Sequence, residues 1–380
     1  MDQERPGIKG LFIVYEDLSA NSGVNKKIKN QIATFQKAGF EMEPYPMPSA
    51  TGAFLYKLLY RLPFSNLSPR WRYDDRFDDV DFVYLRRPFF LTVWALRFFR
   101  KLKRRNPHVR IVYELPTYPY DQEITEKKKN LPVYGKDVVC RRFLHRYVDR
   151  ISILGPEKEV FGIPTIQIKN GYDFESVRPR RPKAEDGTID IAAVACFDSW
   201  HGYDRLMKGL KAYYENGGGR RFRLHFAGDG PALPDYIQLS KDLGLEDSCL
   251  FYGMQDRTEL QGLYDRCDFG ASSFGLYRKG LTLSCDLKSR EYLAAGLPIL
   301  FGGAMDLEQY EDLRPYLIGF SNDDTSVDFF RIERCYEALY EQASSSQGIV
   351  DRIRSVAQRE LTMEKAMEPV TRYIKSHVES

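Results

Sequence analysis

The sequence predicts an α/β protein made of two doubly wound, Rossmann-like domains. Runs of apolar residues with the character of buried parallel strands alternate with helical patterns along the chain. Glycine and proline turns separate many of these segments. The length of 380 residues is enough for two domains that each bury a hydrophobic core.

The first β–loop–α unit lies near the N-terminus. Residues 10–15, with the sequence GLFIVY, have the continuous apolar character of a buried strand. A polar loop at residues 19–23 follows, and residues 24–38 have the pattern of an amphipathic helix that Gly39 ends. Three further strands of this sheet are predicted at residues 81–85, 109–114 and 150–154.

A second sheet is predicted after residues 179–187, which are rich in proline, glycine and charge and are expected to link two domains. Its strands are predicted at residues 189–194, 223–228, 249–253, 269–272 and 298–301. Its helices are predicted at residues 203–215, 232–243 and 258–266. The expected boundary therefore separates a domain of residues 1–178 from one of residues 179–360.

The composition excludes several classes of protein. A hydrophobic fraction of 43% and a charged fraction of 29% are those of a globular chain, and a net charge of +3 argues against a dedicated nucleic-acid binder. Six scattered cysteines predict buried thiols in a reducing cytosol, and five histidines without ligand spacing argue against structural zinc. The N-terminus lacks the pattern of a signal peptide, and the longest apolar stretch, residues 88–99, is too short to span a membrane. We expect a cytoplasmic protein.

The most informative segment is residues 286–298, which predict a short helix that Gly296 and Pro298 end. Lys288 and Glu291 lie three residues apart and therefore share one face of that helix. A lysine together with free N–H groups at a helix start can hold a diphosphate, and a carboxylate can accept hydrogen bonds from sugar hydroxyls. The alternative is a surface ion pair, which the same spacing also allows.

Five stretches, in order, resemble the retaining, nucleotide-sugar-dependent glycosyltransferases of the GT-B fold in glycosyltransferase family 4. Residues 21–27 resemble the N-terminal glycine loop, 168–173 the "NGID" crossing, 200–206 the "KGxxxL" segment, 226–231 "GDGP", and 286–298 the "SKxxEYxAxGxP" variant. The resemblance implies two domains that face an interdomain cleft. Residues 1–178 would bind the acceptor, residues 179–360 the nucleotide sugar, and a last helix within residues 361–380 would cross back to the first domain.

The resemblance also implies the reaction. A sugar, expected to be a hexose, would pass from a nucleotide diphosphate to an acceptor hydroxyl with retention of configuration, without a metal or another cofactor. The expected acceptor is a glycan or a lipid-linked glycan of cell-surface polysaccharide. The alternatives are a catalytically silent GT-B protein and a GT-B epimerase or phosphorylase. A dinucleotide oxidoreductase is disfavoured because no GxGxxG follows the first strand.

The donor-binding residues carried over by the resemblance come from several loops. They are Lys288, Glu291, His201, Ser284, Gly228, Asp229, Gly230 and Gly23. The chain departs from the family in three ways: His201 stands for a lysine, no arginine occurs near Cys196, and Leu283 stands for a first glutamate. Lys288, Arg278 and Lys279 are candidates to supply the missing positive charge. Asp286 is a complication, because as an N-cap it would compete with phosphate for the same N–H groups.

Acceptor-side chemistry is predicted after the strand at residues 109–114. Glu114 and Asp121 could receive the proton of the acceptor hydroxyl or orient the acceptor. The PTYPYD run at residues 116–121 resembles bacterial polysaccharide-assembling members of the family, and the alternative is a proline-stiffened structural loop. Asp79-Val80-Asp81 matches a metal-binding DxD pattern of another fold, but a solvated turn is the preferred interpretation, so no metal ligand is predicted.

A basic and aromatic segment at residues 86–110 leaves two interpretations open. Its phenylalanines and Trp94, interspersed with arginines and lysines, suit an anionic membrane surface, and a similar run lies at residues 56–64. A basic amphipathic helix packed on the sheet explains the first stretch equally well. The expected location is therefore cytoplasmic, with peripheral attachment at the inner face of a membrane as an open possibility.

Overall fold

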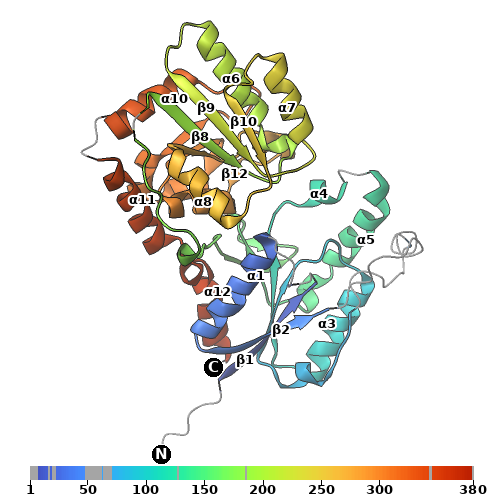
Figure 1. Cartoon of the computed structure of the whole chain (residues 1–380). Helices are drawn as coiled ribbons and strands as arrows, with labels where there is room; N and C mark the ends of the chain where they lie inside the picture. Colours follow the sequence, from blue (N-terminus) through green and yellow to red (C-terminus); the bar gives the residue numbers. More distant parts are fainter. Residues whose placement is uncertain are drawn as a thin grey trace, which may run out of the picture. The chain divides into compact units, whose positions relative to one another are not determined.

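The computed structural model describes residues 7–15, 18, 23–47, 62, 71–125, 128–184, 186–341 and 345–378. The chain divides into two compact units, Met1–Lys169 with Met363–Ser380, and Asn170–Thr362. Each unit is a predominantly parallel sheet covered by helices (Figure 1). The sequence had placed this division at residue 178.

The sheet of the first unit has the strand order β2-β1-β3-β4-β5-β7-β6, parallel except for the β6–β7 pair. Its strands are β1 (Ile8–Val14), β2 (Phe40–Pro46), β3 (Phe82–Arg86), β4 (Arg110–Leu115), β5 (Arg150–Ile153), β6 (Glu159–Val160) and β7 (Ile163–Gln167). Its helices are α1 (Gly23–Lys37), α3 (Val93–Arg105), α4 (Asp121–Thr125), α5 (Leu131–Arg141) and α12 (Met363–Val378).

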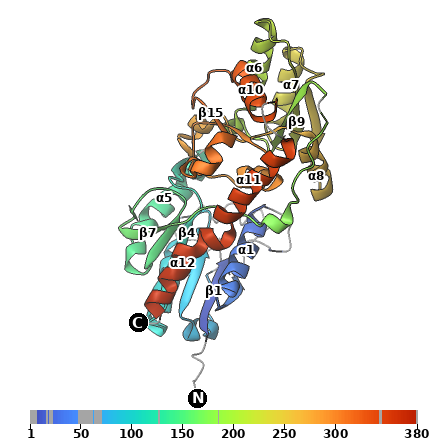
Figure 2. The same ribbon diagram turned by 90° about the vertical axis from the view of Figure 1, so that its left-hand side faces the viewer.

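The helices of the first unit cover opposite faces of its sheet, because successive strand residues point to opposite sides. Helices α1 and α12 pack with Phe12 and Tyr84 in one apolar cluster. Helices α3 and α5 pack with Ile13 and Val83 in the other. Figure 2 shows α12, the last helix of the chain, in the first unit with α1.

The sheet of the second unit has the order β10-β9-β8-β11-β13-β15, and a short parallel pair, β12-β14, lies apart from it. Its strands are β8 (Thr188–Val194), β9 (Arg221–Ala227), β10 (Cys249–Gly253), β11 (Phe269–Ala271), β12 (Leu283–Ser284), β13 (Ile299–Gly302), β14 (Ala304–Met305) and β15 (Leu317–Phe320). Its helices are α6 (Tyr203–Glu215), α7 (Leu233–Asp242), α8 (Arg257–Arg266), α9 (Leu287–Ala295), α10 (Phe329–Tyr336) and α11 (Ser346–Glu360).

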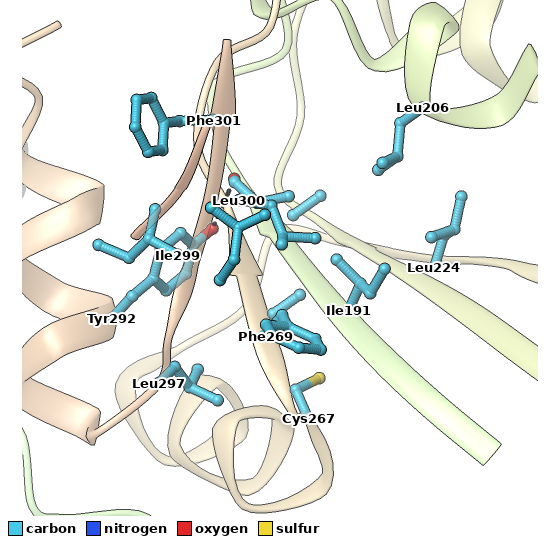
Figure 3. Packing of buried hydrophobic residues seen from close by; sticks show 14 of the residues in the cluster. Ile191, Leu206, Leu224, Cys267, Phe269, Tyr292, Leu297, Ile299, Leu300 and Phe301 are labelled. Atoms are coloured by element: carbon cyan, nitrogen blue, oxygen red, sulfur yellow. Dashed lines mark hydrogen bonds between the residues drawn. The ribbon is translucent and has the colours of Figure 1, made fainter. Parts of the chain in front are cut away.

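One continuous core fills the second unit, and it fixes α9 against the sheet. Tyr292 of α9 and Ile299 and Leu300 of β13 belong to this core, and all three are fully buried (Figure 3). The Tyr292 hydroxyl accepts a hydrogen bond from the Val194 N–H at 2.9 Å, so α9 is tied to the end of β8. The helix that carries Lys288 and Glu291 is therefore held rigidly beside the carboxyl end of a central strand.

The strand order of the second unit reverses between β8 and β11. In open α/β sheets, ligands bind beyond the carboxyl ends of strands at such a switch point. The loops that leave β8 and β11 therefore form the best-placed site in this unit.

The stretch expected to link the domains is packed onto the second unit. Arg180 is buried and donates hydrogen bonds to the Cys267 carbonyl at 3.0 Å and the Tyr340 hydroxyl at 2.8 Å. The two points where the chain passes between the units are paired, because Tyr172 and Thr362 form a parallel bridge. The passage thus lies before residue 179 and not within residues 179–187.

Candidate functional site

Three loops of the second unit meet at the carboxyl ends of its central strands. They are residues 195–202 after β8, residues 228–232 after β9, and residues 272–286 after β11. Backbone hydrogen bonds join the first two loops, since Phe197 N–H donates to Asp229 O at 2.7 Å and Ala232 N–H donates to Phe197 O at 3.1 Å. The Phe274 N–H donates to His201 O at 2.7 Å and joins the third. Main-chain contacts therefore set the shape of this region.

The predicted glycine turn is required by close backbone approach. Gly228 has φ +132°, and a Cβ there would lie 1.9 Å from the Ala195 oxygen. Gly230 has φ +153°, and its Cβ would lie 2.3 Å from the Phe197 oxygen. L-residues rarely adopt these φ values, so only glycine fits both positions. The Asp229 carboxylate is exposed and accepts the Gly230 N–H at 2.7 Å, so it stabilises the turn from within.

His201 is a buried, neutral ring in an aromatic stack. It lies between Trp200, with ring centroids 4.1 Å apart, and Tyr203, with centroids 5.6 Å apart. Burial and the nearby Lys288 charge lower the pKa of His201 to about 2. Its Nδ1 accepts the Asp198 N–H at 3.0 Å, so the neutral ring carries its proton on Nε2. The imidazolium form of His201, which a neighbouring phosphate would favour, is therefore not present in the free protein. The neutral ring can donate one hydrogen bond, from Nε2.

Lys288 is the cation best placed for an anion. Its ammonium donates to the Tyr203 hydroxyl at 3.4 Å and lies 5.8 Å from the centre of the Trp200 ring. It forms no ion pair with the carboxylates that the structure describes. Burial lowers the pKa of Lys288 to about 8, although the Asp286 charge opposes this shift. A half-buried amine without a close counterion gains charge stabilisation from a bound anion.

Of the two other candidate cations, only Lys279 is available. Its ammonium lies 4.3 Å over the Trp200 ring, and within the described part of the chain no carboxylate pairs with it. Arg278 makes bidentate hydrogen bonds to Asp204 at 2.8 and 3.0 Å and a further one to Asp324 at 3.1 Å. These carboxylates, Asp204 first, raise the pKa of Arg278 further. Lys279, Trp200 and Lys288 therefore form one cationic and aromatic surface.

The start of α9 is already capped. Asp286 accepts hydrogen bonds from the Ser289 N–H at 2.7 Å and from the hydroxyls of Ser272 and Ser284, both at 2.6 Å. Although burial opposes it, the charge of Lys288 and these hydroxyls lower the pKa of Asp286 to about 2, so the carboxylate is ionised. The predicted role of Ser284 in donor binding, as a sugar contact in place of the missing glutamate, is disfavoured, because its hydroxyl proton is committed to Asp286.

Glu291 lies on the same helix, three residues after Lys288. Its Oε1 accepts the Tyr264 hydroxyl at 2.8 Å. Burial raises the pKa of Tyr172, and the Glu291 charge raises it further. The Tyr264 hydroxyl therefore positions this carboxylate, and Tyr172 lies close enough for the Glu291 charge to affect its pKa. Neither tyrosine could be predicted from the sequence as a neighbour of Glu291, because neither is near it in the chain.

Glu114 of the first unit is fully buried and held by four groups. It accepts hydrogen bonds from Gln31 at 3.0 Å and Tyr84 at 2.9 Å, and it pairs with Lys27 at 3.2 Å and Arg86 at 3.8 Å. Burial alone would raise its pKa, but the cations, Lys27 first, and these hydrogen bonds hold the pKa below its usual range. A buried carboxylate with a lowered pKa is a poor proton acceptor, so a structural role fits Glu114 better than the predicted catalytic one.

Asp121 and Gly23 are the other residues of the first unit that were predicted to bind substrate. Asp121 is partly exposed, and its Oδ1 accepts the Tyr134 hydroxyl at 2.8 Å and the Arg141 guanidinium at 2.9 Å. These partners lower its pKa against the effect of burial. Gly23 is the first residue of α1, whereas Asn21 and Ser22 lie outside the described residues, as does the basic and aromatic run at residues 56–64 apart from Leu62.

Asp79 and Asp81 both contact Lys9. Asp79 pairs with the Lys9 ammonium at 2.6 Å, and Asp81 accepts the Lys9 N–H at 2.7 Å. Among the described residues, no group of three or more His, Cys, Asp and Glu side chains could hold a metal ion. In the same residues, no helix is both long and apolar enough to cross a bilayer. Cys196, expected to be buried with the other thiols, is exposed on the loop after β8.

Solved structures of glycosyltransferases share this architecture over nearly the whole chain. One is a glycosyltransferase from Rickettsia africae, with a TM-score of 0.64 at 12% identity, covering 99% of this chain and 100% of that one. HepE of Anabaena, solved with UDP and glucose, has a TM-score of 0.60 at 13% identity and coverages of 97% and 100%. The catalytic domain of starch synthase IV from Arabidopsis thaliana, bound to ADP and acarbose, has a TM-score of 0.62 at 10% identity and coverages of 98% and 100%.

The chain has the GT-B fold. No family model matches the sequence, and no curated protein matches it. At these identities the likeness shows the GT-B fold alone, so the activity has to be argued from the site.

Proposed function

We propose that this GT-B protein is a glycosyltransferase that moves a sugar from a nucleotide-diphosphate sugar to an acceptor hydroxyl. The observation that carries the proposal is Lys288, a half-buried cation with no described carboxylate partner beyond the carboxyl ends of β8 and β11. Three residues along the same helix, Glu291 supplies an oriented carboxylate. An ammonium group and a carboxylate placed in this way can bind a diphosphate and the diol of a ribose, respectively.

The donor diphosphate would lie against the surface formed by Lys279, Trp200 and Lys288. The two ammonium groups would stabilise the negative charge that grows on the leaving phosphate as its bond to the anomeric carbon breaks. His201 would add one neutral N–H from Nε2, and the 228–230 turn would bound the pocket. Glu291 would accept the ribose hydroxyls. Protein cations would therefore do the work that a metal ion does in other transferases.

The acceptor would bind the first unit near Gly23 and Asp121. Because Glu114 is buried, Asp121 is the better candidate to orient the acceptor hydroxyl. The family resemblance supports a hexose donor and retention of configuration. It also supports a glycan or lipid-linked glycan of cell-surface polysaccharide as the acceptor, assembled on the cytoplasmic side of the membrane. HepE with UDP and starch synthase IV with ADP make UDP- and ADP-sugars the first donors to test.

A thermal-shift screen of nucleotide diphosphates and their sugars tests the proposal, because a ligand of the native state raises the melting temperature. We expect one nucleotide series to stabilise the wild-type protein and Lys288→Ala and Glu291→Ala to lose most of that stabilisation. Lys241→Ala, an exposed lysine on α7, is the control. Full stabilisation of both site variants by the best ligand would refute the site.

A catalytically silent donor-binding protein is the second candidate. The Asp286 cap favours this silent protein. The Ser289 N–H donates to the Asp286 carboxylate and is not available to a phosphate, and the carboxylate leaves a negative charge near Lys288. Release of nucleotide diphosphate that requires an acceptor distinguishes the transferase from this protein. It also distinguishes the transferase from an epimerase or a phosphorylase of the same fold.

A further inference from the structure

Helix α3 carries a one-sided cationic surface. Its sequence, VWALRFFRKLKRR, contains no acidic residue. The apolar residues Ala95, Phe98, Phe99 and Leu102 pack into the core, so they fix the orientation of the helix. The opposite side is exposed and includes four basic side chains that we call the cation stripe: Arg97, Arg100, Lys101 and Arg104. With Arg105, they line a cavity of about 490 Å³.

The cation stripe is not neutralised by the described part of the chain. Lys103 pairs with Asp149 at 2.7 Å and Arg105 pairs with Asp78 at 2.5 Å, but no described carboxylate pairs with a member of the stripe. Two of the stripe's cations lie over aromatic rings instead, Arg97 over Trp94 at 4.6 Å and Lys101 over Tyr73 at 4.4 Å. The stripe therefore attracts anions at its surface.

Helix α5 exposes an apolar stripe. Leu131 is 54% exposed, Val139 57% and Phe143 38%. Leu131 and Val139 lie about 80° apart around α5, and Phe143 follows in the turn after the helix. Between them, Gly135 has no atom within 4 Å of the place a Cβ would occupy, so nothing in the described structure covers this side. The Arg146 guanidinium lies 5.0 Å from the Phe143 ring.

The two stripes belong to one face of the first unit. Helices α3 and α5 both pack on the same side of its sheet (Figure 1). The segment that leads into α3 contacts α5, since Leu91 N–H donates to Asp137 at 2.8 Å. Phe89 and Val93, which are 48% and 37% exposed, lie at this junction. The exposed Val93 therefore lies one helical turn from Arg97 of the cation stripe, and the apolar stripe of α5 lies on the same side of the sheet.

We propose that this face docks the protein onto an anionic lipid bilayer, with the cation stripe against phosphate headgroups and the apolar stripe in the interfacial region. Charge complementarity argues for this occupant, and the exposed apolar side chains argue against a nucleic-acid or polysaccharide chain. The surface differs from the one that the sequence suggested. Phe90, Phe98 and Phe99 are buried in the core, and the apolar contribution comes from α5. Because the proposal concerns the first unit alone, it does not depend on the donor site.

Co-sedimentation with phosphatidylcholine vesicles, with and without phosphatidylglycerol, tests this docking without any sugar donor. We expect the wild-type protein to bind only the anionic vesicles, and to bind them less as salt rises. The triple variant Arg97→Glu, Arg100→Glu, Arg104→Glu should lose on the order of a hundredfold or more in partitioning, since each basic residue near an anionic surface contributes about fivefold. The control Lys241→Glu, Arg352→Glu, Lys375→Glu makes the same charge change at exposed positions elsewhere and should bind like the wild type.

A second variant isolates the apolar contribution. Val139→Ser with Phe143→Ser should keep salt-sensitive binding at low salt and lose the residual binding at high salt. Circular dichroism and melting temperature should match the wild type, because these side chains are exposed. The proposal is overturned by equal binding to neutral vesicles, by full binding of the charge-reversal variant, or by lipid-free self-association that the serine variant abolishes. The last result would make the apolar stripe an interface between two copies of the chain.

Discussion

The ammonium group of Lys288 lies 3.4 Å from the hydroxyl of Tyr203, whose ring stacks on the neutral imidazole of His201. Tyr203 begins α6, which follows β8, and Lys288 lies in the first turn of α9, which follows β11 in the main sheet. Their meeting places a cation without a close counterion beside an aromatic stack, and most of the proposed chemistry depends on this arrangement.

Donor affinity should depend on pH through Lys288. The pKa of its ammonium is about 8 in the free protein, and a bound diphosphate would raise it. Below this pKa the amine is already charged, so the affinity for UDP-glucose should be constant; above it, binding must take up a proton, and the dissociation constant should rise about tenfold per pH unit. Isothermal titration in buffers of different ionisation enthalpy measures both effects. Lys288→Arg should bind independently of pH, and a pH-dependent Lys288→Arg would contradict the assignment.

Lys279 and Arg278 should respond differently to replacement by alanine. Lys279 has no described carboxylate partner, so Lys279→Ala should weaken donor binding about five- to tenfold without lowering the melting temperature. Arg278 pairs with Asp204, so the main effect of Arg278→Ala should be a lower melting temperature and not weaker donor binding. Titration of UDP-glucose and thermal unfolding of both variants measure the difference. If the Lys279 variant kept full affinity, Lys279 would have no place in the donor site.

The glycine turn should not tolerate a side chain. Gly228→Ala places a Cβ against the Ala195 oxygen at a strained φ of +132°, which should cost about 2 kcal/mol or more and displace the loop after β8. Gly219→Ala is the matched control, because a Cβ there meets nothing within 4 Å. Chemical denaturation measures the free energy of unfolding of each variant. Titration with UDP-glucose measures whether displacement of the loop after β8 weakens donor binding. Equal effects of the two variants would remove the turn as a determinant of the site.

Glu114 should act as a structural anchor. Glu114→Gln leaves the cations of Lys27 and Arg86 without their buried partner, which should cost about 3 kcal/mol of unfolding free energy. Because the folded pKa of Glu114 is lowered, its contribution is present above the unfolded pKa and is lost as pH falls through the folded pKa. Chemical denaturation of the wild type and of Glu114→Gln at neutral and acidic pH should show that the difference in their unfolding free energies becomes smaller only at acidic pH. A variant with wild-type stability and no transferase activity would instead support the catalytic role predicted from sequence.

Strand prediction succeeded where the strands are buried on both faces. Strands β1, β4 and β8 are mostly apolar and almost continuously buried, because helices cover both sides of a parallel sheet. Strand β2 was missed because its sequence, FEMEPYP, alternates with acidic residues and contains two prolines. Its position at the sheet edge explains this composition, since only one neighbour needs its N–H groups.

The sequence predicted the shared helix face of Lys288 and Glu291 but not the side chains from other segments that contact them. The spacing of Lys288 and Glu291 is local, and a helix converts it into a shared face. The partners Tyr203, Tyr264 and Tyr172 come from elsewhere in the chain, and no spacing rule connects them to α9.

The order of apolar runs and glycine turns in this sequence was sufficient for the α/β class, because local backbone preference and residue pattern specify strands and helices. Which charged side chains are free of ion pairs, and so can bind a ligand, was decided only by the tertiary structure. Whether Arg278 pairs with Asp204 while Lys279 stays unpaired, or whether Phe98 is buried while Phe143 is exposed, depends on neighbours that are distant in sequence. Burial and counterion distance are properties of the packed structure, and they determine which of the many basic and aromatic residues can meet a ligand.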